Sequence, residues 1–165
     1  MPTTTPMLVR AREIMTRSPV TVPHTATVAE AAALLEEESI HGAPVVNTYG
    51  KVIGVVSRTD VARHLRESLD DAAEGPASSV LEALISRRLA EGNEAVEGLS
   101  APVQEAMSER PVTADPESTA GALAELMHRE GIQRVFIVSE ERLVGVVSAS
   151  DLMPVLVRYE RERRG

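Results

Sequence analysis

The chain of 165 residues carries 17 basic and 25 acidic residues, a formal net charge of −8, three aromatic residues and no cysteine. The negative charge disfavours nucleic acid as the main partner, and the scarcity of aromatic side chains removes the platforms on which bases stack. The lack of cysteine excludes disulfides, thiolate metal sites and cysteine nucleophiles. A chain of this length buries a core of its own, here built from aliphatic residues and methionine.

The first residues, Met-Pro-Thr-Thr-Thr-Pro, are polar and interrupted by proline, and they lack the apolar core of a signal peptide. No apolar run approaches the length of about 20 residues that a membrane-spanning helix needs. We therefore expect a cytoplasmic protein with no membrane partner, and a disordered N-terminal segment over residues 1–8.

An internal repeat organises the rest of the chain. Residues 15–47 align with 107–139, and residues 49–61 align with 140–152, with 15 identities in 46 aligned pairs. Prolines, glycines, a serine and an aspartate match in register, which amphipathic patterning alone does not produce. The sequence therefore predicts two copies of one unit. Each copy is too small to close a good core alone, so we expect the two to pack against each other.

Each copy is predicted to run strand, helix, strand, strand, helix. Thr27 and Glu30 form a capping box that opens the first helix, and Gly50 marks the turn of a hairpin. In the first copy we expect a strand at 20–22 ended by Pro23, a helix at 27–38, strands at 44–46 and 51–56, and a helix from 59. In the second copy the helix spans 119–130, strands span 135–138 and 143–147, and a helix starts near 150.

The region between the copies, residues 68–102, is predicted to contain an amphipathic helix. Ser79 and Glu82 fit a capping box, Gly92 provides a stop, and apolar residues recur between them at helical spacing: Leu81, Leu84, Ile85 and Leu89. The apolar stripe of this helix must be covered, either by its own domain or by a partner or second copy.

The motif Gly-Val-Val-Ser-x-x-Asp occurs in both copies, at residues 54–60 and 145–151, where a strand runs into a helix. One interpretation is purely structural: the serine caps the helix and the aspartate favours the helix dipole. The other is functional. Free N–H groups at a helix start suit a phosphate, and a carboxylate one turn further on accepts both hydroxyls of a ribose. Two copies in register favour the functional interpretation.

These residues resemble the cystathionine β-synthase (CBS) domain, which occurs in tandem pairs called Bateman modules. The resemblance rests on Ile14–Thr16, Pro19–Val22, Ile40–Val46 and Gly54–Asp60, and on Ala106–Ser108, Pro111–Thr113, Gly131–Val138 and Gly145–Asp151. It implies an α+β fold of two β-α-β-β-α repeats packed as a pseudo-two-fold pair, with a helical insert between them. The implied divisions are a disordered start at 1–8, repeat 1 at 9–67, a linker with a helix at 68–102, repeat 2 at 103–160 and a tail at 161–165.

The resemblance also implies two clefts for adenosine-containing ligands, each using residues of both repeats. One would use Ser57, Thr59 and Asp60 with Pro111, Ile132, Gln133 and Arg134. The other would use Ser148, Ser150 and Asp151 with Pro19, Ile40 and His41. Arg58 and Arg134 would bias phosphate-rich ligands toward the Asp60 cleft, because the second cleft has Ala149 and Gly42 at the corresponding places. Phe136 stands where the family often has a proline.

The function implied is that of a stand-alone sensor that is not an enzyme. It would bind AMP, ADP or ATP, with S-adenosylmethionine less favoured, and signal to a protein partner that the sequence does not identify. Such pairs commonly form homodimers through their helices. The alternative is a dimerisation or scaffold module with vestigial ligand sites. No metal site is expected, because the four histidines are scattered along the chain.

Overall fold

The computed structural model describes residues 8–68 and 98–164, which belong to two compact units. The repeat-1 unit comprises residues 20–111, and the repeat-2 unit joins residues 1–19 to residues 112–165. The amphipathic helix expected in the 68–102 insert and most of the expected disordered segment 1–8 lie outside the described residues.

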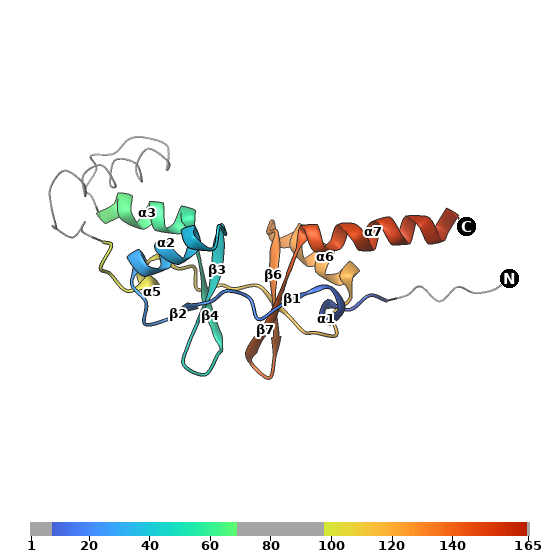
Figure 1. Ribbon diagram of the computed structural model, residues 1–165, viewed down its shortest axis with the longest axis horizontal. Coiled ribbons are helices and arrows are strands. Elements are labelled where there is room, and N and C mark those ends of the chain that lie inside the picture. Colours follow the sequence, from blue (N-terminus) through green and yellow to red (C-terminus); the bar gives the residue numbers. More distant parts are fainter. Residues whose placement is uncertain (1–7, 69–97, 165) are drawn as a thin grey trace. The chain divides into compact units, whose positions relative to one another are not determined.

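The repeat-1 unit is a three-stranded sheet with two long helices on the same side (Figure 1). The sheet order is β2-β3-β4, with β2 parallel and β4 antiparallel to β3. The elements in chain order are β2 (Val22–Pro23), α2 (Val28–Glu37), β3 (Gly42–Val46), β4 (Val52–Ser57), α3 (Arg58–Ser68) and the short α5 (Val103–Ala106).

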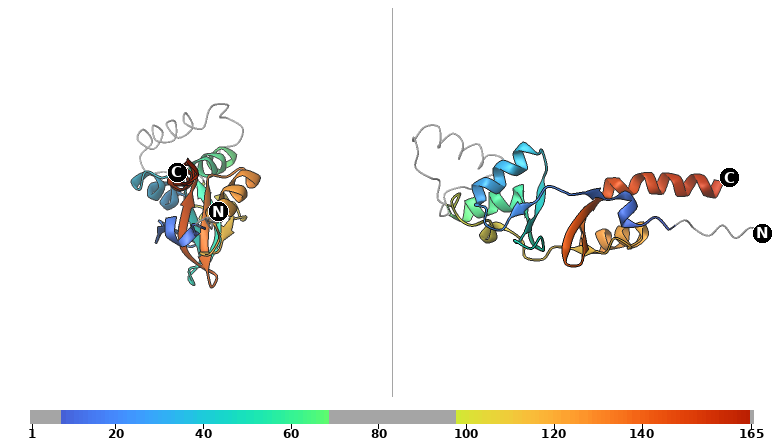
Figure 2. Two further views of the ribbon diagram at one scale, coloured as in Figure 1. Left: turned by 90° about the vertical axis from the view of Figure 1, so that its right-hand side faces the viewer. Right: turned by 60° about the horizontal axis from the view of Figure 1, so that its bottom comes forward.

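The repeat-2 unit is a four-stranded sheet in the order β1-β7-β6-β5, with helices α6 and α7 beside it (Figure 2). Its elements are α1 (Ala11–Ile14), β1 (Thr16–Arg17), β5 (Thr113–Ala114), α6 (Ala120–Glu130), β6 (Arg134–Ser139), β7 (Arg142–Ser148) and α7 (Ala149–Arg164). The order strand, helix, strand, strand, helix is therefore confirmed in both units, and so is the α+β class.

The end of the first strand differs from the sequence prediction. The strand expected at 20–22 is β2, and it includes Pro23 instead of ending before it. Proline is tolerated there because β2 is an edge strand of its sheet, and Pro23 needs no N–H for the parallel pairing with Val46. The last helix, α7, ends at Arg164 and so includes most of residues 161–165.

Each unit is completed by the segment that precedes the other copy of the repeat. The short helix α1, with Ala11 fully buried, contributes to the repeat-2 core, whereas α5 contributes Val103 and Ala106 to the repeat-1 core. Equivalent hydrogen bonds fix the two segments: the N–H of Val28 donates to the carbonyl of Ala101, and the N–H of Ala120 donates to that of Val9, both at 2.9 Å.

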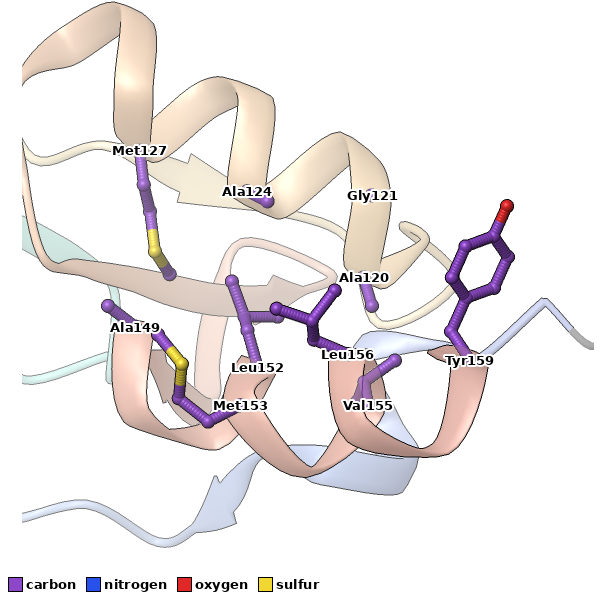
Figure 3. Close-up of a pocket in the computed structure, with 10 residues that line it drawn as sticks. All are labelled: Ala120, Gly121, Ala124, Met127, Ala149, Leu152, Met153, Val155, Leu156 and Tyr159. Atoms are coloured by element: carbon purple, nitrogen blue, oxygen red, sulfur yellow. The ribbon is translucent and has the colours of Figure 1, made fainter. Parts of the chain in front are cut away.

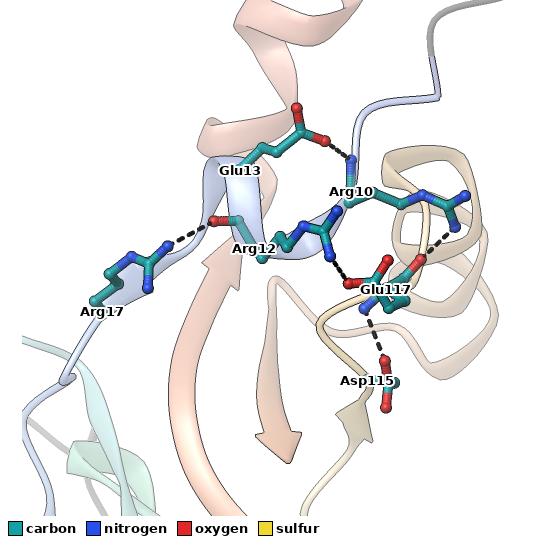
Figure 4. A network of polar contacts seen from close by, with 6 residues as sticks. All are labelled: Arg10, Arg12, Glu13, Arg17, Asp115 and Glu117. Carbon is teal, nitrogen blue, oxygen red and sulfur yellow. Dashed lines mark hydrogen bonds and ion pairs between the residues drawn. The ribbon is translucent and has the colours of Figure 1, made fainter.

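Polar contacts also hold the N-terminal segment within the repeat-2 unit (Figure 4). The Arg12 guanidinium forms an ion pair with the Glu117 carboxylate, and Arg10 donates to the Glu117 carbonyl at 2.7 Å. Asp115 in turn accepts the N–H of Glu117 at 2.7 Å. The side chains of Arg12 and Glu117 are about half exposed, so the ion pair mainly orients the segment and adds little stability.

Aliphatic side chains form the two cores, as the composition predicts. Leu35 and Leu65 are the largest fully buried side chains of the repeat-1 unit, and Leu123 and Ile137 are those of the repeat-2 unit. Each buried side chain of this size contributes about 1.5–3 kcal/mol of transfer free energy. The cores therefore lie between the helices and one face of each sheet, and the strand-to-helix junctions are left at their edges.

The start of α6 is capped less completely than the start of α2, which gives a first prediction. Thr27 and Glu30 form a complete capping box, whereas Thr119 only accepts the N–H of Ala122 at 3.2 Å. Ala122→Glu supplies the missing carboxylate to the N–H of Thr119. We expect it to raise the free energy of unfolding in urea by about 0.5–1 kcal/mol. Ala122→Lys is the control, and equal stabilisation by lysine would contradict the capping explanation.

Candidate functional site

The junction between β4 and α3 holds Ser57 and Asp60 in reciprocal capping bonds. The N–H and the Oγ of Ser57 both donate to Oδ2 of Asp60, at 2.9 and 2.6 Å. In return, the N–H of Asp60 donates to Ser57 Oγ at 3.1 Å. The capping bonds expected from the structural interpretation of the motif are therefore present, and they fix the orientation of the carboxylate.

The second carboxylate oxygen of Asp60 is also occupied. Oδ1 accepts a hydrogen bond from Nη2 of Arg63 at 2.7 Å, and the Asp60 side chain is only 15% exposed. Arg63 lies one turn further along α3. Both oxygens of this carboxylate are therefore engaged within the repeat-1 unit.

The junction between β7 and α7 repeats the capping bonds. The N–H and the Oγ of Ser148 donate to Oδ2 of Asp151 at 2.7 and 2.6 Å. Ser148 Oγ also lies 2.8 Å from Oγ of Ser150. Because the Ser148 hydroxyl proton goes to Asp151, the Ser150 hydroxyl is the donor in this contact.

The two junctions differ at the residue three positions after the aspartate. Arg63 of repeat 1 corresponds to Pro154 of repeat 2, which has no donor to offer. Among the described residues, Oδ1 of Asp151 has no hydrogen-bond partner, although Oδ2 is fixed by Ser148. The repeat-2 junction thus presents an oriented, open carboxylate oxygen, and the repeat-1 junction does not.

Arg58 serves the fold of the repeat-1 unit. Its Nε donates to the carbonyl of Ile40 at 3.0 Å, and its Nη2 donates to the carbonyl of Leu35 at 3.1 Å and lies 3.3 Å from Glu36. These carbonyls belong to the last turn of α2 and the loop after it, where a cation offsets the helix dipole. The guanidinium expected to favour a phosphate at Asp60 is therefore engaged elsewhere.

Arg134 lies beside the repeat-2 junction. On the antiparallel strands β6 and β7 it is directly opposite Ser148, so the two side chains share one face of the sheet. Val135 and Val147, which are next along the strands, point into the core, so Arg134 and Ser148 lie on the face away from it. The side chain of Arg134 is exposed and has no hydrogen-bond or ion-pair partner in the described part of the chain.

The loops before β3 and β6 contact the junctions through their backbones. The carbonyl of His41 accepts the N–H of Arg58 at 3.0 Å, and the carbonyl of Gln133 accepts the N–H of Ala149 at 2.9 Å. Both side chains are exposed. Each loop therefore lies against the first residue of its own unit's last helix.

The predicted ligand residues are divided between the units. The repeat-1 unit holds Ile40, His41, Ser57, Arg58, Thr59, Asp60 and Pro111, and the repeat-2 unit holds Pro19, Ile132, Gln133, Arg134, Ser148, Ser150 and Asp151. Both clefts expected from the resemblance combine residues of the two units, so they remain predictions. The residue overlooked in the sequence is Arg63, whose replacement by Pro154 is visible in the alignment of the two repeats.

Other kinds of site find no support in the described ranges 8–68 and 98–164. These residues contain no group of three histidine, aspartate or glutamate side chains placed to hold a metal ion. None of their helices has the length and apolarity required to cross a bilayer.

Comparison with known families identifies both repeats. The CBS domain model matches residues 11–67 and again residues 103–158. The chain belongs to the CBS domain family. The two matches confirm the tandem pair expected from the motifs.

Relatives of this CBS pair differ in size and context. An uncharacterised protein of Methanocaldococcus jannaschii is 27% identical over 152 residues, covering 88% of this chain and 90% of that protein. The human 5'-AMP-activated protein kinase subunit gamma-3 is 30% identical over 82% of this chain but only 24% of its own length. A CBS domain protein from Pyrobaculum aerophilum, solved as a complex with AMP, has the same fold, with a TM-score of 0.61, 23% identity, and coverage of 93% and 99% of the two chains.

Proposed function

We propose that this chain is a cytoplasmic regulatory module that binds an adenine nucleotide at the repeat-2 junction. Two features together carry the proposal. An oriented oxygen of Asp151 is open at the start of the long helix α7, and the unpaired side chain of Arg134 lies on the neighbouring strand β6. In the described part of the chain, these groups have no partner that explains them.

The geometry suits the two polar parts of a nucleotide. A ribose presents two hydroxyl donors, which Oδ1 of Asp151 can accept without losing the capping bonds that Oδ2 makes. A phosphate is attracted by the positive end of the α7 dipole, by the Arg134 guanidinium and by the Ser150 hydroxyl, which can rotate toward it. Aliphatic side chains and backbone must hold the base, because the chain has only three aromatic residues.

The positive charge of Arg134 predicts which ligands bind more tightly. AMP, ADP and ATP carry an anionic group for Arg134, whereas the sulfonium of S-adenosylmethionine is a cation that Arg134 repels. We therefore place the adenine nucleotides before S-adenosylmethionine. Structures with the same fold contain ligands of both kinds, AMP in one and 5'-methylthioadenosine with S-adenosyl-L-methionine in another. The proposed order therefore rests on the charge of Arg134.

The proposed role is regulatory, with signalling through a conformational change. A ligand changes the relative arrangement of the two repeats only to the extent that it binds one arrangement more tightly than another. We propose that two partners respond to this change. One is a second copy of the chain in a homodimer, and the other is a protein partner that the sequence does not identify.

Thermal unfolding with added nucleotide tests the proposal. AMP, ADP and ATP are each expected to raise the melting temperature saturably, by the equivalent of about 2.7 kcal/mol at a hundred times the dissociation constant. S-adenosylmethionine is expected to have a smaller effect, and guanosine monophosphate serves as the base control. No shift with any adenine nucleotide at millimolar concentration would refute the proposal.

A scaffold or dimerisation module with vestigial sites is the second candidate. It is favoured by the capping bonds, which account for Ser57, Asp60, Ser148 and the Oδ2 atom of Asp151 without any ligand. It does not account for the open Oδ1 atom of Asp151. The thermal experiment separates the two candidates, because a scaffold is not stabilised by nucleotides.

A further inference from the structure

An apolar groove runs between α6 and α7 of the repeat-2 unit (Figure 3). It has a volume of about 460 Å³, and its lining is hydrophobic apart from the hydroxyl of Tyr159. Figure 3 shows Ala120, Gly121 and Tyr159 at the same end of the groove. The lining residues are Ala120, Gly121, Ala124 and Met127 on α6, and Ala149, Leu152, Met153, Val155, Leu156 and Tyr159 on α7.

The described part of the chain begins at this end of the groove. The N–H of Ala120, which lines the groove, donates to the carbonyl of Val9 at 2.9 Å. Leu8 is the first described residue, and residues 1–7 precede it outside the described ranges. Two residues of chain span at most about 7 Å, so Met7 lies close to the groove whichever way the segment runs.

Repeat 1 contains the equivalent segment in full. Continued toward the N-terminus without a gap, the alignment of the repeats pairs residues 98–101 with residues 6–9. The carbonyl of Leu99 accepts the N–H of Ala29 at 2.9 Å, and the Leu99 side chain packs against the repeat-1 core. Leu99 therefore covers the repeat-1 core beside the start of α2.

Gly98 extends this cover onto α3. A Cβ atom at Gly98 would lie 2.6 Å from Oγ of Ser68 and 3.5 Å from Nε2 of His64. The counterparts of Ser68 and His64 in repeat 2 are Tyr159 and Val155, and both line the groove. The part of α3 that this segment contacts thus corresponds to the part of α7 that forms the groove.

The backbone N–H of Gly121 lacks the partner that its counterpart has. Gly121 corresponds to Ala29, whose N–H is bonded to Leu99. Among residues 8–68 and 98–164, the N–H of Gly121 has no acceptor. It belongs to the first turn of α6, where N–H groups have no partner within the helix. The carbonyl of Met7, placed as that of Leu99 is, would accept it.

The correspondence between the two segments ends at Met7. Gly98 has a φ of +94°, a conformation that the ring of Pro6 excludes. The chain before Met7 must therefore take a different direction from the chain before Leu99. Leu8 corresponds to Ser100, and both are exposed. This leaves Met7 as the side chain that enters the groove, and a flexible thioether suits an irregular apolar space.

We infer that the chain covers its own α6–α7 groove with its N-terminal segment, by docking Met7 between the start of α6 and Tyr159. The inference narrows the disordered segment expected at 1–8 to the residues before Met7. It also assigns an autoinhibitory contact, since any other molecule that uses this end of the groove must first displace Met7. It goes beyond the proposed function and does not depend on nucleotide binding.

Thiol labelling tests the docking, because the chain has no cysteine of its own. Relative to the rates in urea, Met7→Cys is expected to react with iodoacetamide at least roughly ten-fold more slowly than Leu8→Cys in the native full chain. Adding Tyr159→Asp places a charge in the groove and is expected to remove this protection. Val157→Asp is the matched control, since Val157 is 50% exposed on the same helix and does not line the groove. Equal labelling of the two cysteine variants would overturn the inference.

Hydrogen exchange of the backbone amides gives an independent readout. In the wild type, the Gly121 amide is expected to be protected to the same degree as the Ala29 amide. Met7→Asp is expected to speed exchange at Gly121 at least about ten-fold and to leave Ala29 unchanged. Leu8→Asp is the control with the same charge at the neighbouring residue. Fast exchange at Gly121 in the wild type, or protection that survives Met7→Asp, would contradict the docking of Met7.

Dilution identifies the chain that supplies the segment. Protection of Met7→Cys that is independent of protein concentration supports docking within one chain. Protection that disappears on dilution shows that a second copy covers the groove or supplies the segment, and the inference is then wrong. The nucleotide site is judged separately: protection in a chain that fails to bind AMP leaves the inference standing and refutes that site, and AMP binding without protection does the reverse.

Discussion

Asp151→Asn is expected to weaken AMP binding by roughly 10- to 100-fold in isothermal titration calorimetry. The open Oδ1 atom of Asp151 is proposed to accept the ribose hydroxyls, and hydrogen bonds to a charged group contribute about 1.5–3 kcal/mol each. Oδ2 is held by Ser148 at 2.6–2.7 Å, so in the wild type the carboxylate is already oriented and little entropy is lost when the ligand binds.

Asp60→Asn is the matched control for this prediction. It removes the same charge and one acceptor oxygen in the other unit, but in the wild type the Oδ1 atom of Asp60 is already bonded to Arg63 at 2.7 Å. We expect less than about a five-fold change in AMP affinity, since the Asp60 carboxylate has no free oxygen for a ribose hydroxyl. Urea denaturation of both variants corrects for any weakening of the caps. Strong loss of binding in Asp60→Asn with retention in Asp151→Asn would reverse our assignment of the two junctions.

Arg63→Ala provides a gain-of-binding test of the same idea. Removing the guanidinium frees Oδ1 of Asp60 and makes the repeat-1 junction resemble the repeat-2 junction, where Pro154 occupies the equivalent place. Titration calorimetry is expected to show tighter binding of a second AMP molecule. Arg66→Ala, on the same helix, is the charge-matched control. Unchanged stoichiometry and affinity in Arg63→Ala would count against the role given to the open oxygen.

Gly54→Ala is expected to lower the free energy of unfolding by about 3 kcal/mol. A Cβ atom at Gly54 would lie 2.5 Å from Sδ of Met107 and 2.8 Å from the carbonyl oxygen of Ser108. That carbonyl accepts the N–H of Val55 at 2.9 Å, and the carbonyl of Val55 accepts the N–H of Ser108 at 2.8 Å. The new methyl group therefore pushes a backbone segment off β4 and strains two hydrogen bonds.

Gly145→Ala is the matched variant in the other repeat. Its Cβ atom would also meet a methionine, with Sδ of Met15 at 2.5 Å, but its three nearest atoms are all in that side chain. A methionine side chain moves at lower cost than a bonded carbonyl. We expect Gly145→Ala to cost about half as much as Gly54→Ala in urea denaturation. Equal or reversed costs would show that the Ser108 carbonyl does not limit the space at Gly54.

Local chemistry accounts for the features that were predictable. Thr27 with Glu30, and each motif serine with its aspartate, lie three residues apart, and capping bonds at that spacing depend only on neighbouring backbone. The hairpin turn at Gly50, with a φ of +77°, is equally local. The helices and strands of both repeats were predictable for this reason.

Features that depend on long-range pairing were not predictable from such patterns. The antiparallel pairing of Thr16 with Val146 joins residues that are distant in sequence, and two-residue strands carry no periodicity of their own. The short helices α1 and α5 have four residues each, too few for a helical pattern to stand out.

The sequence by itself determined that the protein is a tandem CBS pair with two equivalent strand-to-helix junctions, because duplication and capping are both recorded in residue identity and spacing. The replacement of Arg63 by Pro154 is also recorded in the sequence, and it leaves one oxygen of Asp151 open. Only the tertiary structure decided the partners of Arg58, whose guanidinium donates to the carbonyl of Leu35 in the last turn of α2. It also covers α3 with α5 and leaves α7 exposed. The partner of a side chain is set by which segments meet in space, and spacing along the chain does not record that.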